Sequence, residues 1–301
     1  MAHVVVIINP IAGTGGRAGV GHTRAMRATA LLEARGLEAD VCVSASPGHA
    51  RDLAAAALQR GASTVVAWGG DGTVNEVASA LAFRDAALAI VPSGSGNGLA
   101  RELGIPFEPT AAFAVAFDGH DRVIDAGELD GRLFFNIAGI GLDAEVAHQF
   151  AAGGLKRRGL ARYIEITARQ LLAYLPEAYT IEIDGIAIRQ TSLIVALANA
   201  RQYGNGALIA PAAKIDDGLL DVVVVAARSP WRVLVQVPRI FLGQIARVPG
   251  VTIRNAREVA ITSARPIRYH VDGEPNVGGS RLAGRVHSAA LRIKVPVRTT
   301  S

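Results

Sequence analysis

The strongest constraint on the fold is an alternation of short apolar runs with helix-like segments over the first hundred residues. The apolar runs cover residues 3–8, 37–44, 63–68 and 87–92, and a segment of helical character follows each of them. Strands that are apolar along nearly their whole length are typical of a parallel sheet covered by helices on both faces. The sequence therefore predicts a doubly wound α/β domain, which we place at residues 1–122.

The rhythm changes after about residue 122. Three Asp-Gly pairs, at residues 130–131, 184–185 and 272–273, each lie between strand-like runs. Asp-Gly is a strong signal for a two-residue hairpin turn. Residues 123–301 are therefore predicted to form a mostly antiparallel β domain, and the last residues are expected to be able to return to the first domain.

Composition and charge exclude several classes of protein. Cys42 is the only cysteine, so the chain has no internal disulfide and no cysteine-based zinc site, and a cytoplasmic setting is expected. No apolar stretch reaches the roughly 18 residues of a spanning helix. The net charge of +5 comes mainly from arginine, which suits phosphate or an anionic bilayer, or reflects composition alone. No basic motif of a nucleic-acid-binding type is present, so no nucleic-acid partner is expected.

Residues 155–175 predict a helix with a basic start, formed by Lys156, Arg157, Arg158 and Arg162. Such a helix can contact lipid headgroups, which would make the protein peripherally membrane-associated. A surface helix with a solvated basic end explains the same residues and is slightly favoured. The sequence leaves both interpretations open.

The stretch GGDGTVNE (69–76) joins the third apolar run to a helix. Thr73 and Glu76 have the spacing of a capping box, which predicts a helix that begins at Thr73 with its positive dipole end toward Gly72. Phosphate binds well at such a helix start. Glycines would allow close approach of a ligand, and Asp71 would project from the carboxyl end of a parallel strand, where ligands of open α/β sheets bind. The alternative is that Asp71 makes an Asx-turn.

Two further glycine turns follow the first and fourth apolar runs. In the first turn, Gly13, Gly15 and Ala18 match a dinucleotide fingerprint, but Asn9 to Ala12 separate the strand from the first glycine, and Ser44 stands where a ribose-binding acid belongs. No Gly-Lys-Ser/Thr of a P-loop occurs. In the second turn, PSGSGNGLAREL, three polar side chains could reach the same phosphates, namely Ser95, Asn97 and Arg101.

The chain resembles the diacylglycerol kinase catalytic-domain family, which includes bacterial lipid kinases and sphingosine kinases. The resemblance covers essentially the whole chain and rests on an ordered set of motifs: NPIAG (9–13), SPGHA (46–50), GGDGTVNE (69–76), PSGSGNGLARELGIP (92–106), GIGLDAEV (139–146), APAAKIDDGLLDVVVV (210–225) and VDGEP (271–275). GGDGT alone is shared with NAD kinases, but the ordered set is highly specific.

The resemblance implies an N-terminal doubly wound parallel-sheet nucleotide domain and a C-terminal antiparallel β-sandwich domain, with transfer of the γ-phosphoryl group of ATP to a lipid hydroxyl in a cleft between them. It implies a magnesium site remote from the phosphates, formed by the carbonyls of Lys214 and Leu219 and the carboxylate of Asp217. It also implies a nucleotide site lined by Asn9, Gly13, Ser44, Gly69, Gly70, Gly72, Thr73, Asn75, Ser95 and Arg101.

The resemblance places Asp71 and Glu274 at the reacting centre. Transfer to a hydroxyl needs a carboxylate within roughly 3 Å to accept its proton. We assign this role to Glu274 and assign Asp71 to a catalytic Mg²⁺ and the phosphates, with Asp71 as the alternative base. Without the resemblance, Glu274 would be interpreted as a solvated turn residue. Asp143 is expected either to orient the acceptor headgroup or to cap a helix.

Departures from the family pattern leave the acceptor lipid open. Ala12 replaces a usual serine or threonine, and Gly98 replaces an aspartate common in diacylglycerol-specific members. An NAD kinase is the nearest alternative enzyme, although it does not account for PSGSGNGLAREL or DDGLLD. A regulator that binds nucleotide or lipid without catalysis is the alternative from another class. Whether the chain forms a homodimer is also left open.

Overall fold

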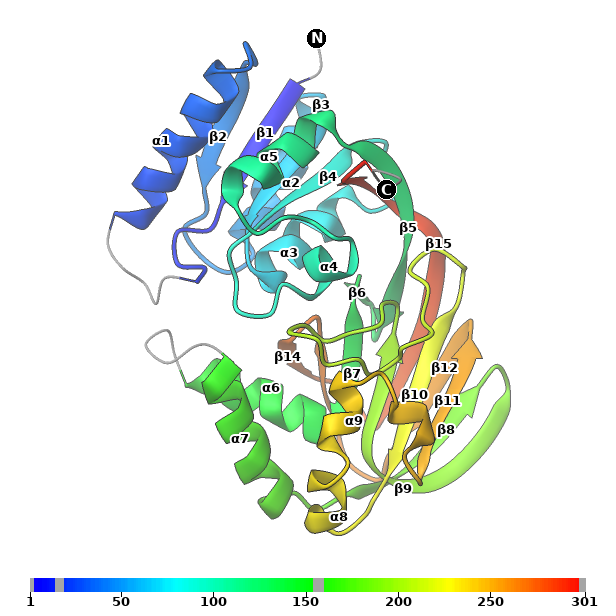
Figure 1. Cartoon of the computed structure of the whole chain (residues 1–301). Coiled ribbons are helices and arrows are strands. Elements are labelled where there is room, and N and C mark those ends of the chain that lie inside the picture. The colour runs from blue at the N-terminus through cyan, green and yellow to red at the C-terminus, as the bar shows by residue number, and fades with distance from the viewer. Residues whose placement is uncertain (1–2, 14–18, 154–159, 298–301) are drawn as a thin grey trace. The chain divides into compact units, whose positions relative to one another are not determined.

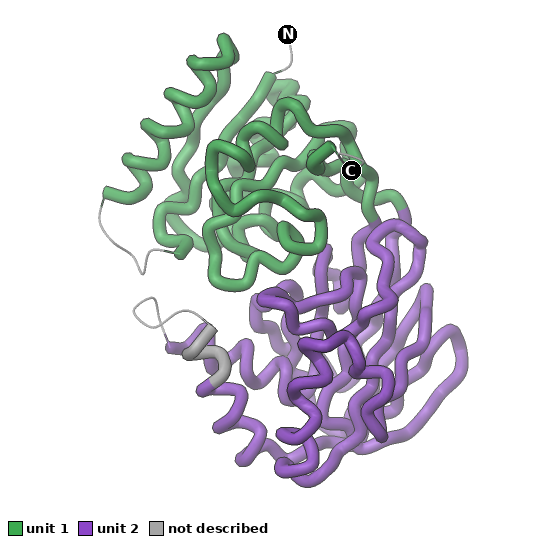
Figure 2. Tube along the Cα trace, in the orientation of Figure 1, with its two compact units in different colours: residues 1–124, 289–301 green, residues 125–288 purple. Residues whose placement is uncertain are grey.

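The computed structural model describes residues 3–13, 19–153 and 160–297, which form two compact units (Figure 2). The first unit comprises the residues up to 124 together with the segment from 289 onward, and the second comprises residues 125–288. The chain leaves the first unit along strand β5 (His120–Leu129) and returns along strand β15 (Arg281–Val295). The second unit is therefore an insertion within the sequence of the first.

A parallel sheet forms the centre of the first unit, with strand order β15-β4-β3-β1-β2 (Figure 1). Every pairing between these neighbours is parallel. The apolar runs put nearly every side chain of β1, β3 and β4 in the core. The four strands that precede β15 are β1 (His3–Ile8), β2 (Ala39–Val43), β3 (Ala62–Gly69) and β4 (Ala87–Pro92).

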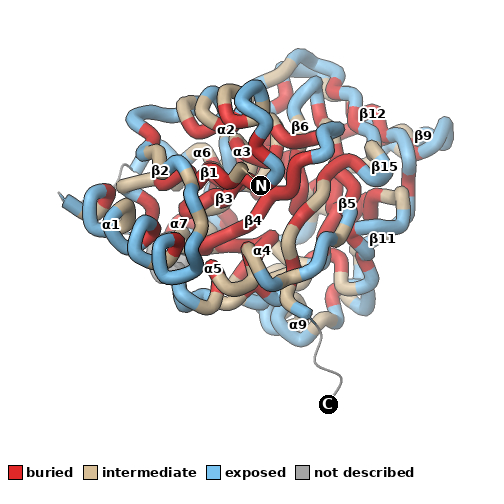
Figure 3. Tube along the Cα trace, turned by 90° about the horizontal axis from the view of Figure 1, so that it is seen from above, coloured by how far each residue is buried: buried red, intermediate tan, exposed pale blue. Residues whose placement is uncertain are grey.

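Helices cover both faces of this sheet. Ion pairs connect α1 and the turn after it to the N-cap and the last residue of α5 on one face, Arg27 with Glu108 at 2.6 Å and Arg35 with Asp118 at 3.0 Å. On the other face α2 packs against α3, and Figure 3 shows the two groups on opposite sides of the strands. The predicted doubly wound arrangement is confirmed. Its helices are α1 (Val20–Glu33), α2 (His49–Gln59), α3 (Asp71–Leu81), α4 (Gly98–Glu102) and α5 (Pro109–Asp118).

The second unit is an antiparallel β-sandwich, as the resemblance implied. Its strands pair in the order β14-β13-β7-β9-β8-β12-β15, with β10 on β9 and β11 on β10. Alternate residues of β10 face two apolar clusters: Val222 and Val224 belong to one, and Val223 to the other. The strands not yet given are β6 (Arg132–Phe134), β7 (Ile137–Gly141), β8 (Glu177–Ile183), β9 (Ile186–Ala198), β10 (Leu220–Ala226), β11 (Val251–Ala256), β12 (Glu258–Thr262), β13 (Arg268–Val271) and β14 (Glu274–Val277).

The three Asp-Gly pairs form hairpin turns, which confirms the prediction made from them. Both residues of each pair have positive φ, for example 47° at Asp272 and 85° at Gly273. Aspartate and glycine tolerate this left-handed backbone better than other residues, so they determine where the strands reverse. The turns join β5 to β6, β8 to β9 and β13 to β14.

Helices of the second unit lie outside its sheet layers. They are α6 (Leu142–Ala152), α7 (Leu160–Ala173), α8 (Pro230–Leu234), α9 (Val237–Phe241) and a 3₁₀ turn at Ile245–Arg247. The helix predicted from residue 155 is present from Leu160, whereas Lys156, Arg157 and Arg158, and the side chain of Arg162, lie outside what the structure describes. Across the described ranges, no helix combines the length and apolarity needed to cross a bilayer.

Candidate active site

Three loops meet at the carboxyl edge of the parallel sheet in the first unit. They follow β1, β3 and β4, and the loop after β4 approaches each of the other two so closely that side chains are excluded. A Cβ on Gly94 would lie 2.6 Å from the Cα of Gly70, and a Cβ on Gly13 would meet the carbonyl oxygen of Ser93. Backbone at this separation cannot move aside cheaply, so glycine is required at these positions.

Asn9 ties the first loop to the second. Its Nδ2 donates to the Oγ1 of Thr73 at 2.8 Å, and its Oδ1 accepts from the amide of Ile11 at 3.0 Å. Arg24 of helix α1 donates from its guanidinium to the carbonyls of Asn9 (2.7 Å) and Ala12 (2.8 Å). The loop that begins at Asn9 is thus fixed from two sides.

The capping box predicted at Thr73 and Glu76 is wrong. Helix α3 begins at Asp71 with Gly70 at its N-cap, and no side chain caps it. Thr73 is a buried residue within α3, and its hydroxyl accepts the hydrogen bond from Asn9. Glu76 instead accepts the amides of Gly48 (2.8 Å) and Ala50 (3.1 Å), at the start of helix α2, which has no side-chain cap of its own.

The start of helix α3 leaves backbone amides outside its hydrogen-bond ladder. The first intrahelical bond of α3 is donated by the amide of Val74 to the carbonyl of Gly70 at 3.0 Å. The amides of Gly72 and Thr73 precede it, so the helix ladder leaves them available to an anion. The same end of the helix carries the positive end of its dipole.

Asp71 connects the second and third loops. Its Oδ2 accepts from the amide of Asn97 at 2.8 Å and its Oδ1 from the amide of Gly98 at 2.7 Å, at the start of helix α4. The carboxylate therefore reaches across to the neighbouring turn, which differs from the local Asx-turn considered as its alternative role. Gly96 passes so close that a Cβ there would lie 2.9 Å from Asp71 Oδ2.

Arg101 and Ser93 complete the third loop. Arg101 donates from Nε to the carbonyl of Gly96 at 2.9 Å, and its guanidinium lies 4.5 Å from the centre of the Phe107 ring. Ser93, which the sequence analysis did not single out, has a buried Oγ without a hydrogen-bond partner. Buried hydroxyls normally form hydrogen bonds, so the Ser93 hydroxyl at this edge is a candidate to bond with a polar ligand.

The remaining predicted nucleotide residues lie near the same edge of the sheet. Ser44 is buried directly after β2, and its amide donates to the carbonyl of Ile8 at 2.8 Å. Asn75 lies on α3 and accepts from the hydroxyl of Ser79 at 3.4 Å. Ser95 is exposed at the tip of the third loop. A Cβ on Gly69 would lie 2.4 Å from the Cβ of Thr73, so this glycine serves packing.

Glu274 belongs to the second unit, where it begins β14 directly after the Asp272-Gly273 turn. Its side chain is exposed, and its backbone position is fixed by Asp272. The carboxylate of Asp272 accepts three consecutive amides, from Phe135 (2.9 Å), Asn136 (2.9 Å) and Ile137 (3.0 Å). An exposed carboxylate on a firmly held turn is a geometry that can serve a proton acceptor.

Asp143 is buried in a polar group of three side chains, the Asp143 network. Its Oδ2 lies 2.9 Å from Nε2 of His270 and accepts from the hydroxyl of Tyr203 at 2.7 Å. Burial alone would lower the pKa of His270, but the charge and hydrogen bond of Asp143 outweigh it and the pKa is raised. The carboxylate does not cap helix α6, whose N-cap is Gly141 without a side-chain bond. Sequence spacing gave no signal for His270 or Tyr203.

The residues predicted to bind magnesium form one loop before β10. Asp217 accepts the amide of Leu219 at 3.1 Å, and no described loop hydrogen bond uses the carbonyls of Lys214 or Leu219. Asp221 is buried nearby, and its pKa is raised to about 6 by burial and by the charge of Asp217. Two carbonyls and a carboxylate beside a second acid are hard oxygen donors that fit Mg²⁺. Among the described residues, no three His, Cys, Asp or Glu side chains form a metal-binding group.

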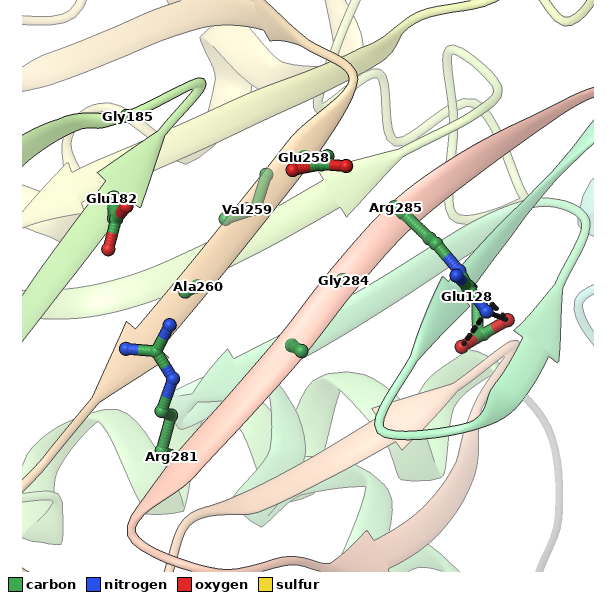
Figure 4. Close-up of a pocket in the computed structure, with 10 residues that line it drawn as sticks. Glu128, Glu182, Gly185, Glu258, Val259, Ala260, Arg281, Gly284 and Arg285 are labelled. Carbon is green, nitrogen blue, oxygen red and sulfur yellow. Dashed lines mark hydrogen bonds and ion pairs between the residues drawn. The ribbon is translucent and has the colours of Figure 1, made fainter.

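A separate depression lies on the second unit and contains none of the predicted site residues (Figure 4). It is lined by charged side chains, including Glu182, Glu258 and Arg281. Two of its lining residues, Arg285 and Glu128, form an ion pair at 3.1 Å. We assign no ligand to it.

A parallel-sheet unit with glycine turns at its carboxyl edge, followed by an antiparallel β-sandwich, is the fold class of diacylglycerol kinases and NAD kinases. A solved structure described as a putative diacylglycerol kinase from Bacillus anthracis superposes with a TM-score of 0.78 at 22% identity and covers 97% of both chains. An NAD kinase from Archaeoglobus fulgidus, in complex with ATP, gives a TM-score of 0.52 at 13% identity over 98% of this chain and 93% of its own. These likenesses concern the fold.

Sequence relatives identify the family within this fold class. Residues 3–129 match the diacylglycerol kinase catalytic domain, and residues 136–295 match the YegS C-terminal NAD kinase beta sandwich-like domain. A probable lipid kinase YegS-like from Pseudomonas aeruginosa is 35% identical over 92% of this chain and 91% of its own. A diacylglycerol kinase from Mycobacterium tuberculosis is 32% identical over 90% and 88%. The chain belongs to the diacylglycerol kinase catalytic-domain family.

Proposed function

We propose that this protein is a lipid kinase that transfers the γ-phosphoryl group of ATP to a lipid hydroxyl. The observation that carries the proposal is the convergence of three glycine loops at one edge of the parallel sheet, where Asp71 joins two of them. The names of the relatives, lipid kinase and diacylglycerol kinase, support the same reaction. Diacylglycerol or a related lipid with a free hydroxyl is the acceptor class.

The nucleotide phosphates are assigned to the three loops of the first unit. Phosphoryl transfer demands positioning and charge stabilisation, which backbone amides and helix ends supply. The amides of Gly72 and Thr73 and the unpartnered hydroxyl of Ser93 are the donors that the structure makes available. Asn9 and Arg101 stabilise the loops, because their side chains form hydrogen bonds with loop residues.

Asp71 and Glu274 are assigned different tasks. Asp71 fixes the loops and contributes negative charge where a nucleotide-bound Mg²⁺ would be held. Glu274 accepts the proton of the acceptor hydroxyl, because its side chain is exposed and follows a turn whose backbone Asp272 holds in place. Glu274→Gln is therefore expected to lower kcat strongly with little change in ATP affinity. An equal loss of both would indicate a structural role.

Mg²⁺ is assigned to the loop before β10, with Lys214, Asp217 and Leu219 as its ligands. When bound there, it would supply positive charge that neutralises the acidic loop and stabilises this part of the sandwich. Addition of Mg²⁺ should raise the melting temperature of the protein, and Asp217→Ala should remove that increase. A similar increase in the variant would place the ion elsewhere.

A panel of acceptors tests the proposed function. Purified protein and labelled ATP are incubated with diacylglycerol, phosphatidylglycerol, sphingosine or NAD, and label in the product is measured. Labelled lipid is the expected result, and Asp71→Ala should abolish it without loss of fold by circular dichroism. Label in NAD would establish the NAD kinase alternative, and label in none would favour a nucleotide- or lipid-binding regulator.

A further inference from the structure

The segment 228–249 of the second unit, which contains α8 and α9, exposes large apolar side chains on a charged surface. Trp231 is 72% exposed, Val235 71% and Leu242 66%, and half of Phe241 is in contact with solvent. Single exposed apolar residues are common, but four within twelve residues form a patch. We refer to these residues as the α8–α9 patch.

The exposure of these side chains is not required by the packing of the segment. Val233 of α8 packs against one apolar cluster of the sandwich, and Ile240 of α9 and the buried Ile245 pack in another. Each turn of the segment therefore has its own inward anchor. The α8–α9 patch is the opposite, outward side of an amphipathic segment, and nothing among the described residues covers it.

The charge of the segment has a single sign. Six arginines occur between Asp221 and Glu258, and no acidic residue occurs between these two. Four of the arginines lie within the segment 228–249 itself, at positions 228, 232, 239 and 247. None of these four has an ion-pair partner among the described side chains. The region therefore joins apolar side chains to uncompensated positive charge.

We propose that the α8–α9 patch docks on the surface of an anionic phospholipid bilayer. Trp231, Phe241 and Leu242 would enter the boundary between headgroups and acyl chains, where tryptophan is favoured because its ring is amphipathic. The arginines would contact lipid phosphates, and their apolar stems would lie along the same boundary. The proposal deepens the proposed function and depends on it for the lipid acceptor. It concerns a different segment from the basic start of the 155–175 helix.

Binding to vesicles without ATP tests the proposal independently of turnover. Wild-type protein is co-sedimented with vesicles of about 30% phosphatidylglycerol in phosphatidylcholine and with pure phosphatidylcholine. The double variant Trp231→Ser/Phe241→Ser should bind the anionic vesicles at least about tenfold more weakly, and so should Arg232→Gln/Arg239→Gln. Wild-type binding that is equal on neutral vesicles would overturn the role of the arginines.

A matched control lies on the β8–β9 hairpin of the same unit. Ile186 is 62% exposed and Arg189 is also exposed, so Ile186→Ser/Arg189→Gln removes similar side chains from another surface. This variant should bind vesicles as the wild type does. If it loses as much binding as the patch variants, the α8–α9 patch has no special role. Thermal denaturation of all variants establishes that they are folded.

The two tryptophans provide a direct readout of insertion. Trp231 is exposed, whereas Trp68 is 3% exposed in the core of the first unit. Vesicles with brominated acyl chains should quench the wild-type fluorescence, and the quenching should disappear in Trp231→Ser. Absence of quenching in the wild type would overturn the proposal.

The same variants separate this proposal from the proposed function. If the protein is a lipid kinase, Trp231→Ser/Phe241→Ser should retain turnover on a short-chain diacylglycerol dispersed in water and lose it on vesicles. Vesicle binding with no turnover on any lipid would refute the kinase and leave the docking surface intact. A wild-type dimer that dissociates in the patch variants, seen by light scattering without vesicle binding, would reassign the patch to self-association.

Discussion

At the scale of single residues, the site depends on backbone that has no room for side chains. Gly13 has φ of 69°, and a Cβ there would meet the carbonyl of Ser93. Gly104 has nearly the same φ, 68°, with open space around it. A side chain at either position would have to adopt left-handed backbone, but only at Gly13 would it also clash with a neighbour. Substitutions at the two glycines therefore form a matched pair.

We expect Gly13→Ala to weaken ATP binding at least about tenfold and to destabilise the protein by more than the roughly 1–2 kcal/mol that left-handed backbone costs an L-residue. Gly104→Ala should show that smaller cost alone and bind ATP normally. Calorimetry with ATP and chemical denaturation measure both effects. Equal behaviour of the two variants would mean that the contact between the loops at residues 13 and 93 is not needed for binding.

The Asp143 network gives a second prediction at this scale. His270→Ala removes one of the two side chains that bond to the buried Asp143 carboxylate, and loss of a buried hydrogen-bond partner costs about 1–3 kcal/mol. Asp143→Asn/His270→Gln keeps a neutral hydrogen-bonding pair, and its loss of stability should be smaller than the sum of the losses in Asp143→Asn and His270→Gln alone. Urea denaturation of the single and double variants completes the cycle. Additive losses would contradict a direct coupling between the two side chains.

At the scale of elements, Glu76 links two helices. It is on α3 but accepts two amides at the start of α2, so it takes the place of a missing N-cap residue. Glu76→Ala should lower the free energy of unfolding by about 1–2 kcal/mol, as loss of a helix cap does. Glu33→Ala removes an exposed glutamate at the end of α1 and should change stability by less than about 0.5 kcal/mol. A loss no larger than that of Glu33→Ala would show that water replaces the cap.

Local sequence predicted the elements well and the partners of polar side chains poorly. The apolar runs and Asp-Gly pairs act within a few residues, so the parallel sheet and the three hairpins follow from them. Glu76 and Asp71 bond to residues 26 to 28 positions away, and Asp143 to residues 60 or more positions away. Such pairs exist because packed elements bring them together. The capping-box spacing therefore predicted the wrong partner for Glu76, because the neighbouring helix α2 provides its amide donors.

At the scale of the whole molecule, the first unit is assembled from both ends of the sequence. The end of β15 pairs with β4 in the parallel register and buries Leu291 (1% exposed), Ile293 (0%) and Val295 (5%). The amide of Phe83 donates to the carbonyl of Ala290 at 2.7 Å, and Lys294 pairs with Asp121 at 2.7 Å. The first unit therefore cannot complete its core until the second unit has been synthesised.

Deletion of residues 289–301 should unfold the first unit while the second unit persists. Burial of three large aliphatic side chains contributes roughly 5–9 kcal/mol, which is comparable to the whole stability of a typical domain. Limited proteolysis should then cleave within residues 1–124 and leave a resistant fragment from residues 125–288. Deletion of residues 298–301, which keeps all of β15, should leave the cleavage pattern unchanged. If the shorter deletion and the longer one give the same resistant products, the return of β15 does not hold the first unit together, and its sheet is stable with four strands.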